Sequence, residues 1–132
     1  MTTMEELERQ LREGCINYGI SYINEHPDHT IPVSKYLLDV FGDKAVEYMA
    51  ALEDVGVKVE ALETAVRYGA GEAPVKAVDY MAALEDVGVK VEALKTAVRY
   101  DAGEASVKAR AYLDQINKPE CVTKLMNELR KL

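Results

Sequence analysis

The stretch AVEYMAALEDVGVKVEALETAVRYGAGEAPVK, residues 45–76, is followed at once by AVDYMAALEDVGVKVEALKTAVRYDAGEASVK, residues 77–108. The two copies differ at only four of 32 positions: Glu47/Asp79, Glu63/Lys95, Gly69/Asp101 and Pro74/Ser106. A fixed repeat of this length is typical of stacked repeat proteins, in which each unit buries one apolar face against its neighbour. The repeat therefore predicts an architecture, although it does not identify a function.

Each copy contains two stretches with the apolar spacing of a helix. In the first copy they are marked by Val46, Met49, Leu52 and by Val59, Leu62, Val66. We predict first helices over residues 43–55 and 74–87, and second helices over residues 58–68 and 90–100. Each unit is then a helical hairpin whose short helices depend on packing against the next unit.

The N-terminal region, residues 1–44, is predicted to hold two further helices. The first covers residues 4–25 and carries an apolar stripe made of Leu7, Leu11, Cys15, Tyr18 and Tyr22. A turn over residues 26–32 contains two prolines, and a short helix over residues 33–41 follows. Gly42 is expected to end that helix, and Gly56 and Gly88 are expected to end the first helix of each repeat.

The tail, residues 109–132, resembles a decayed third unit that caps the stack. Four of its residues keep the spacing of the repeat: Ala109, Tyr112, Leu113 and Ile116. We expect a break at residues 117–119 and a last helix with a basic outer face. The predicted fold is all-α, a single domain of antiparallel helical hairpins stacked as a short solenoid-like array, with about seven helices. An ordinary helical bundle that has absorbed a duplication is the alternative.

The chain is acidic, with 23 acidic and 16 basic residues and a net charge of −7. Phosphate backbones are bound by Lys and Arg that displace counterions, so this charge argues against direct binding of DNA or RNA. The helix–Gly42–helix segment resembles a helix-turn-helix only loosely, and its second helix is acidic. The charge instead favours a basic protein partner.

Two cysteines, Cys15 and Cys121, lie near opposite ends of the chain. The N-terminus lacks the basic and then apolar order of a signal peptide, and no apolar run has the length of a membrane span. We therefore expect a cytoplasmic protein with free thiols and no membrane contact. Cys15 on the predicted stripe is expected to be a buried structural thiol, and neither cysteine has a histidine close in sequence to activate it.

The turn at His26, Asp28 and His29 is the only cluster with the residue types of a chemical site. A metal would need ligands on a stiff frame and a third or fourth donor, which this short turn does not promise. His26 and His29 are thus weak metal candidates, and a polar loop whose Asp28 or Thr30 caps the next helix is the favoured interpretation. We predict no catalytic residue and no cofactor, although a small enzyme or ligand-binding bundle that uses this turn stays open.

Tyrosine recurs with the repeat, at Tyr48, Tyr80 and Tyr112 and in the pairs Arg67–Tyr68 and Arg99–Tyr100. Residues one period apart align along one side of a stack, and Tyr and Arg are favoured anchors at protein interfaces. The first three tyrosines are expected to pack between hairpins. The predicted partner-binding residues are Arg67, Tyr68, Arg99, Tyr100, Glu53, Asp54, Glu85 and Asp86.

These patterns favour a non-enzymatic interaction module that presents a repeated acidic, Tyr-bearing surface to a basic protein partner. Two alternatives stay open. One is a small phage or mobile-element type inhibitor that blocks a basic channel of an enzyme or nucleic-acid-binding complex. The other is an engineered tandem-repeat protein whose second copy has no function. A homodimer also stays open.

Overall fold

In the computed structural model the chain is all-helical over its described residues, which are 4–100 and 103–131; side chains are described for 14–100, 103–116 and 125–131. In this part seven α-helices and one 3-10 helix occur. They are α1 (Met4–Glu25), η1 (Pro27–His29), α2 (Thr30–Phe41), α3 (Lys44–Met49), α4 (Val55–Tyr68), α5 (Ala73–Ala82), α6 (Val87–Tyr100) and α7 (Glu104–Arg130). The predicted fold class is confirmed.

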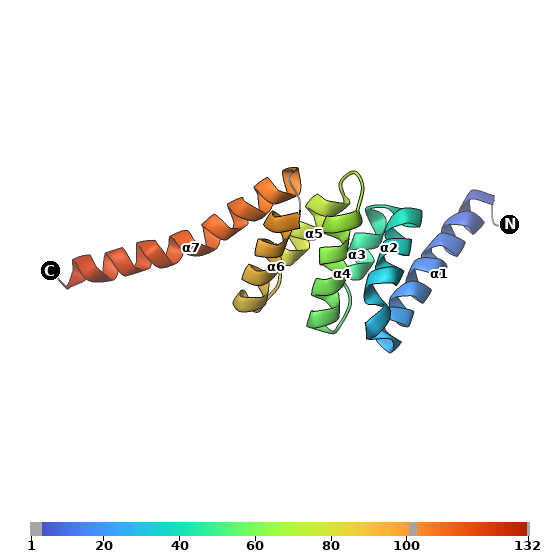
Figure 1. Ribbon diagram of the computed structural model, residues 1–132, viewed down its shortest axis with the longest axis horizontal. Helices are drawn as coiled ribbons and strands as arrows, with labels where there is room; N and C mark the ends of the chain where they lie inside the picture. The colour runs from blue at the N-terminus through green and yellow to red at the C-terminus, as the bar shows by residue number, and fades with distance from the viewer. Residues whose placement is uncertain (1–3, 101–102, 132) are drawn as a thin grey trace.

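The helices form two layers that extend along the long axis of the molecule (Figure 1). Helices α2, α4 and α6 follow one another in one layer, and α3, α5 and α7 follow one another in the other. Helix α1 packs against α2 and α3 at one end. The two copies therefore stack on each other and share one interior, as the repeat predicts.

The core is built from equivalent residues of the two copies. Among the fully buried side chains are Val46 and Val78, Met49 and Met81, and Leu62 and Leu94. Buried alanines at nearly every helix contact let the backbones approach closely, for example Ala61, Ala65, Ala93 and Ala97. The predicted stripe of the first helix in each repeat is thus buried, whereas in the second helices Leu62, Leu94 and Val66 are buried and the other valines of the stripe are half-buried.

The helix ends within the repeats differ from the prediction. Helices α3 and α5 stop well before Gly56 and Gly88, which lie in the first turns of α4 and α6. Asp54 begins α4 because its Oδ1 accepts a hydrogen bond from the Val57 N–H at 3.1 Å. An aspartate in this N-cap position satisfies a backbone donor that the helix leaves free. The equivalent Asp86 Oδ1 accepts from the Val89 N–H at 3.0 Å.

The buried face of α1 is also different from the predicted stripe. Cys15 is exposed, and Tyr18 is 73% exposed. The buried positions are Ile16, Gly19 and Ile23, because Gly19 lets α1 approach α2: a Cβ there would lie 2.9 Å from a methyl group of Leu37. The side chains of Leu7 and Leu11 lie outside the described residues.

The turn after α1 is shorter than predicted. Helix α2 begins at Thr30, and Pro32 lies in its first turn, where a missing N–H breaks no helical hydrogen bond. The predicted caps are wrong, because neither Asp28 nor Thr30 caps α2; the Thr30 hydroxyl instead donates to the Pro27 carbonyl at 2.6 Å. Gly42 does end α2, and its φ of 63° is a conformation that favours glycine.

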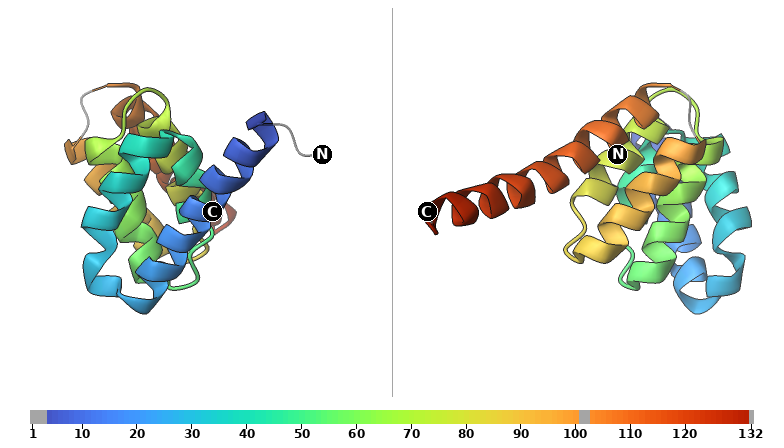
Figure 2. Two further views of the ribbon diagram at one scale, coloured as in Figure 1. Left: turned by 90° about the vertical axis from the view of Figure 1, so that its right-hand side faces the viewer. Right: turned by 60° about the vertical axis from the view of Figure 1, so that its left-hand side comes forward.

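The tail forms one helix instead of a hairpin. Helix α7 continues through residues 117–119, where a break was predicted, and its C-terminal half extends away from the stack (Figures 1 and 2). Its first half does take the place of a third unit: Ala109 is buried, and Tyr112, Leu113 and Ile116 pack against the core. Ser106, which stands where the first copy has Pro74, is buried and donates to the Val98 carbonyl at 3.4 Å.

Candidate functional site

The eight predicted partner-binding residues lie in two groups at opposite ends of α4 and α6. Glu53, Asp54, Glu85 and Asp86 precede these helices, whereas the two Arg–Tyr pairs end them. A helix of 14 residues is about 20 Å long. The predicted residues therefore form two separate surfaces, which we call the acidic end and the Arg–Tyr end.

The Arg–Tyr end is a ladder of cations and rings that joins successive units. Lys35 Nζ lies 3.9 Å from the centre of the Tyr68 ring, and the Arg67 guanidinium carbon lies 4.4 Å from the centre of the Tyr100 ring. A cation over an aromatic face is attracted by the ring quadrupole. Each cation thus contacts the tyrosine of the next unit.

Lys35 was missed by the sequence reasoning, although a signal for it is present. The pair Lys35–Tyr36 stands 32 residues before Arg67–Tyr68, just as Arg67–Tyr68 stands 32 residues before Arg99–Tyr100. The surrounding sequence of residues 1–44 does not otherwise copy the repeat, so this single matching dipeptide is hard to recognise. Lys35 of α2 thus contacts Tyr68 as Arg67 of α4 contacts Tyr100 one unit later.

A small hollow of about 180 Å³ lies beside this ladder, between α4 and α6. Its walls include Glu60, Glu63 and Arg67. Burial raises the pKa of the Glu63 carboxyl and the charge of Glu60 raises it further, while Arg67 and a hydrogen bond with Thr96 oppose this. The pKa of Glu63 is raised overall, so Arg67 and Thr96 do not fully offset the cost of burying this carboxylate beside Glu60.

The acidic end contains the larger hollow, of about 480 Å³. It lies at the junction of the two copies, and its lining includes Val55 and Lys58 from the first copy and Tyr80, Leu84, Glu85 and Asp86 from the second. The lining thus combines the apolar side chains of Val55 and Leu84 and the half-buried Tyr80 with the charged side chains of Glu85 and Asp86. Glu85 and Asp86 of the predicted site belong to it.

A hydrogen-bonded cluster joins α5 to α7. The Asp79 carboxylate accepts from the Tyr112 hydroxyl at 2.7 Å and forms an ion pair with Lys108 Nζ at 2.8 Å. Burial raises the pKa of Asp79, but the hydrogen bonds from Lys108 and Tyr112 and the charge of Lys108 outweigh it, so the pKa is lowered. In the first copy Lys76 pairs with Asp43 at 2.9 Å and with Glu47 at 3.5 Å.

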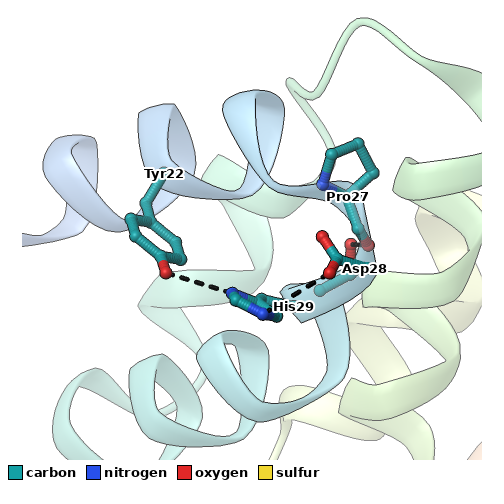
Figure 3. A network of polar contacts seen from close by, with 5 residues as sticks. Tyr22, Pro27, Asp28 and His29 are labelled. Carbon is teal, nitrogen blue, oxygen red and sulfur yellow. Dashed lines mark hydrogen bonds and ion pairs between the residues drawn. The ribbon is translucent and has the colours of Figure 1, made fainter.

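The histidine turn forms a polar network on the surface. Figure 3 shows the Tyr22 hydroxyl pointing at the His29 ring, 3.0 Å from Nδ1, with Asp28 3.5 Å from Nε2. His26 packs against Tyr22 with the ring centres 4.5 Å apart. These side chains do not line the hollows at the acidic end or the Arg–Tyr end.

Two other kinds of feature are absent from the described residues. There, no group of three His, Cys, Asp or Glu side chains is placed to hold a metal ion. None of the helices described is both long and apolar enough to cross a membrane.

Cys15 and Cys121 cannot pair within one chain. Helix α1 lies at one end of the long axis and the C-terminal half of α7 extends from the other (Figure 1). A disulfide requires Cα atoms closer than about 7 Å. Cys15 is exposed and free, and the Cys121 side chain lies outside the described residues.

No protein-family model matches this sequence, and no similar protein was found among curated proteins or among solved structures.

Proposed function

We propose that the protein is a non-enzymatic interaction module whose acidic end binds an extended segment of a basic protein partner. The observation that carries this proposal is the hollow at the junction of the two copies. It combines an apolar floor, a half-buried tyrosine and two carboxylates, Glu85 and Asp86, in one place.

The charges of this surface support a basic partner. Glu53 and Glu85 are exposed at the loops that precede α4 and α6, and both copies carry Asp at the next position. Lys58 is the one cation that lines the hollow. An arginine or lysine of the partner at the rim would meet a local excess of negative charge, which favours encounter and orientation.

The Arg–Tyr end supports this assignment by contrast. Its Lys35 and Arg67 already lie over tyrosine rings of the protein itself. We therefore assign it to the contact between units and assign partner binding to the acidic end. The inhibitor alternative would use the same acidic surface, with a basic channel as the target.

Selection from a displayed library of random peptides on the immobilised protein tests the proposal. We expect the selected peptides to be enriched in Lys and Arg, and their affinity to fall as salt is raised. Glu85→Lys should weaken their binding strongly. Glu92→Lys, an identical change of charge at an exposed position of α6 outside the hollow, should not.

Selected peptides without an excess of basic residues would contradict the proposal. An equal loss of affinity in both variants would contradict it too, because net charge alone would then explain the binding.

A further inference from the structure

The acidic-end hollow occurs twice, in the same register of the repeat. A second hollow of about 250 Å³ lies one unit further along the stack. Five residues that line the first hollow are Ala50, Lys58, Tyr80, Ala83 and Leu84. The residues that line the second stand 32 positions later: Ala82, Lys90, Tyr112, Gln115 and Ile116. The fold therefore builds equivalent hollows at two successive junctions along the stack.

The stacking distance sets the separation of the two hollows. Residues after α3 and on α4 and α5 line the first hollow, and residues on α5, α6 and α7 line the second. Helices α3, α5 and α7 follow one another along the stack (Figure 1). Axes of packed helices lie about 8–10 Å apart. A peptide that fills both hollows must therefore present two side chains on one face at about that distance.

Among regular peptide conformations, polyproline II fits this distance. It has three residues per turn and a rise of about 3.1 Å, so residues i and i+3 share a face about 9.3 Å apart. In a β-strand, side chains on one face are separated by about 6.7 or 13 Å. Helix positions i and i+7 are about 10.5 Å apart, and the helix itself is about 10 Å or more wide.

The two hollows differ in charge, which gives the bound segment a direction. Glu85 and Asp86 line the first hollow, and the residues 32 positions later are Asn117 and Lys118. The sequence therefore has no carboxylate at the positions that correspond to Glu85 and Asp86. A basic residue of the partner would be placed next to the side chain that fills the first hollow.

The tyrosine of the second hollow is held in place by the protein. The Tyr112 hydroxyl donates to Asp79, which also pairs with Lys108. A ring fixed by such a network forms a preorganised wall, which lowers the entropy lost when a ligand binds.

We propose that the two hollows together bind a polyproline II segment whose apolar residues at i and i+3 fill the first and second hollow, with Arg or Lys next to the first. This inference rests on the proposed function, because it specifies the segment that the acidic end binds. Grooves lined by aromatic side chains are a known way to bind this conformation.

Binding of labelled peptides, followed by fluorescence anisotropy, tests the inference. The probe is a proline-rich peptide with Leu at i and i+3 and Arg beside the first Leu. We compare it with a peptide that keeps only the first Leu, with one that has Leu at i and i+2, and with a helical peptide that has Leu at i and i+7. We expect the i, i+3 probe to bind about 10- to 100-fold more tightly than the single-Leu peptide, which is the effect of burying one further leucine.

Two matched variants fill the hollows at equivalent, exposed positions. Ala83→Trp fills the first hollow, and Gln115→Trp fills the second. We expect Ala83→Trp to abolish binding of both proline-rich peptides. Gln115→Trp should reduce the i, i+3 probe to the affinity of the single-Leu peptide and leave the latter unchanged. Circular dichroism confirms that each variant is folded.

The outcomes separate this inference from the proposed function. If Ala83→Trp abolishes binding but Gln115→Trp has no effect, the partner uses one hollow, so the inference fails and the proposed function stands. Tighter binding of the i, i+2 or the helical peptide overturns the polyproline II conformation. If none of the peptides binds and the random library also selects no basic peptide, both proposals are wrong.

Discussion

The two copies of the repeat have nearly the same sequence, yet equivalent residues are not buried to the same extent. Three residues of α4 that are buried become half-buried at the equivalent positions of α6; they are Val57, Thr64 and Val66. Helix α4 lies between α2 and α6 in its layer, whereas α6 is the last described helix of that layer. Position in the stack therefore changes the environment of a residue even where its sequence neighbours are identical.

Truncating either of two equivalent core leucines, one in each copy, should cause the largest loss of stability. Leu62 and Leu94 are both fully buried. Leu→Ala at such a site costs about 2–5 kcal/mol, depending on how far the surroundings collapse into the cavity. We expect Leu62→Ala to be more destabilising than Leu94→Ala, because α4 is held on both sides and cannot relax as α6 can. Urea denaturation followed by circular dichroism measures both changes.

The exposed Val107 provides the control for this pair. It is 67% exposed, so Val107→Ala should change the free energy of unfolding by less than about 0.5 kcal/mol. Equal losses for the two leucines, or a larger loss at Leu94, would show that the end unit is packed as rigidly as the inner one.

The repeat and its apolar stripes could be predicted from the sequence because stacking units must bury the same positions. Helix ends could not be placed as well. Gly56 and Asp54 both lie near the start of α4, and each is a common residue at a helix boundary. The structure uses Asp54 as the N-cap, and this decides where the helix begins.

The buried face of α1 and the candidate site were less predictable, because both depend on how helices pack against one another. Helix α1 carries two overlapping apolar stripes, and the choice between them depends on the close approach that Gly19 allows against Leu37. The Arg–Tyr pairs were recognised, but their contact with one another across units depends on stacking geometry. The repeat spacing relates Tyr112 to Tyr80, but the second hollow depends on how α5, α6 and α7 pack around Tyr112.

Replacing a residue of the first copy by its counterpart in the second should give the next largest loss of stability. The first copy has Gly69 where the second has Asp101, which lies outside the described residues. A Cβ at Gly69 would lie 2.4 Å from the Ala65 carbonyl oxygen and 2.8 Å from the Ala73 Cβ. We expect Gly69→Asp to destabilise the protein by about 1–3 kcal/mol, because backbone must move to relieve the clash. Thermal unfolding measures this loss.

Gly14→Ala is the matched control for this substitution. A Cβ at Gly14 meets nothing within 4 Å, and Gly14 lies inside α1. Replacing a glycine within a helix by alanine should stabilise the protein by about 0.5–1 kcal/mol. If Gly69→Asp is also neutral or stabilising, the backbone of the loop between α4 and α5 can change conformation at no cost in stability.

Removing an ion pair that joins two units should cause a smaller loss of stability, and this loss should depend on pH. Asp79 has a lowered pKa in the folded chain, so its stabilisation is present above the unfolded pKa of about 3.9 and is lost as the pH falls through the folded value. Asp79→Asn should cost about 0.5–1 kcal/mol at pH 7, because water screens this partly exposed pair. The difference from wild type should shrink below pH 4.

In the first copy, Glu47→Gln changes the equivalent carboxylate. Lys76 keeps Asp43 as a partner at 2.9 Å, so we expect a smaller loss than for Asp79→Asn. Unfolding measured from pH 2 to pH 7 compares the two variants. A pH-independent loss in Asp79→Asn would mean that the Asp79–Lys108 charge pair does not account for the loss.

Substitutions in the cation–aromatic ladder should give the smallest difference in stability between the two copies. Arg67 lies over the Tyr100 ring, whereas Arg99 has no such ring in the described part of the chain. Exposed cation–π contacts contribute about 0.5–1 kcal/mol. We expect Arg67→Gln to cost that amount and Arg99→Gln to cost less, because both arginines lie in the last turn of their own helix but only Arg67 is known to contact the ring of the next unit. A double-mutant cycle of Arg67→Gln with Tyr100→Leu isolates the contact between units. A coupling energy near zero would mean that the ladder only reflects the stacking, and Arg67 and Tyr100 would then be available to a partner after all.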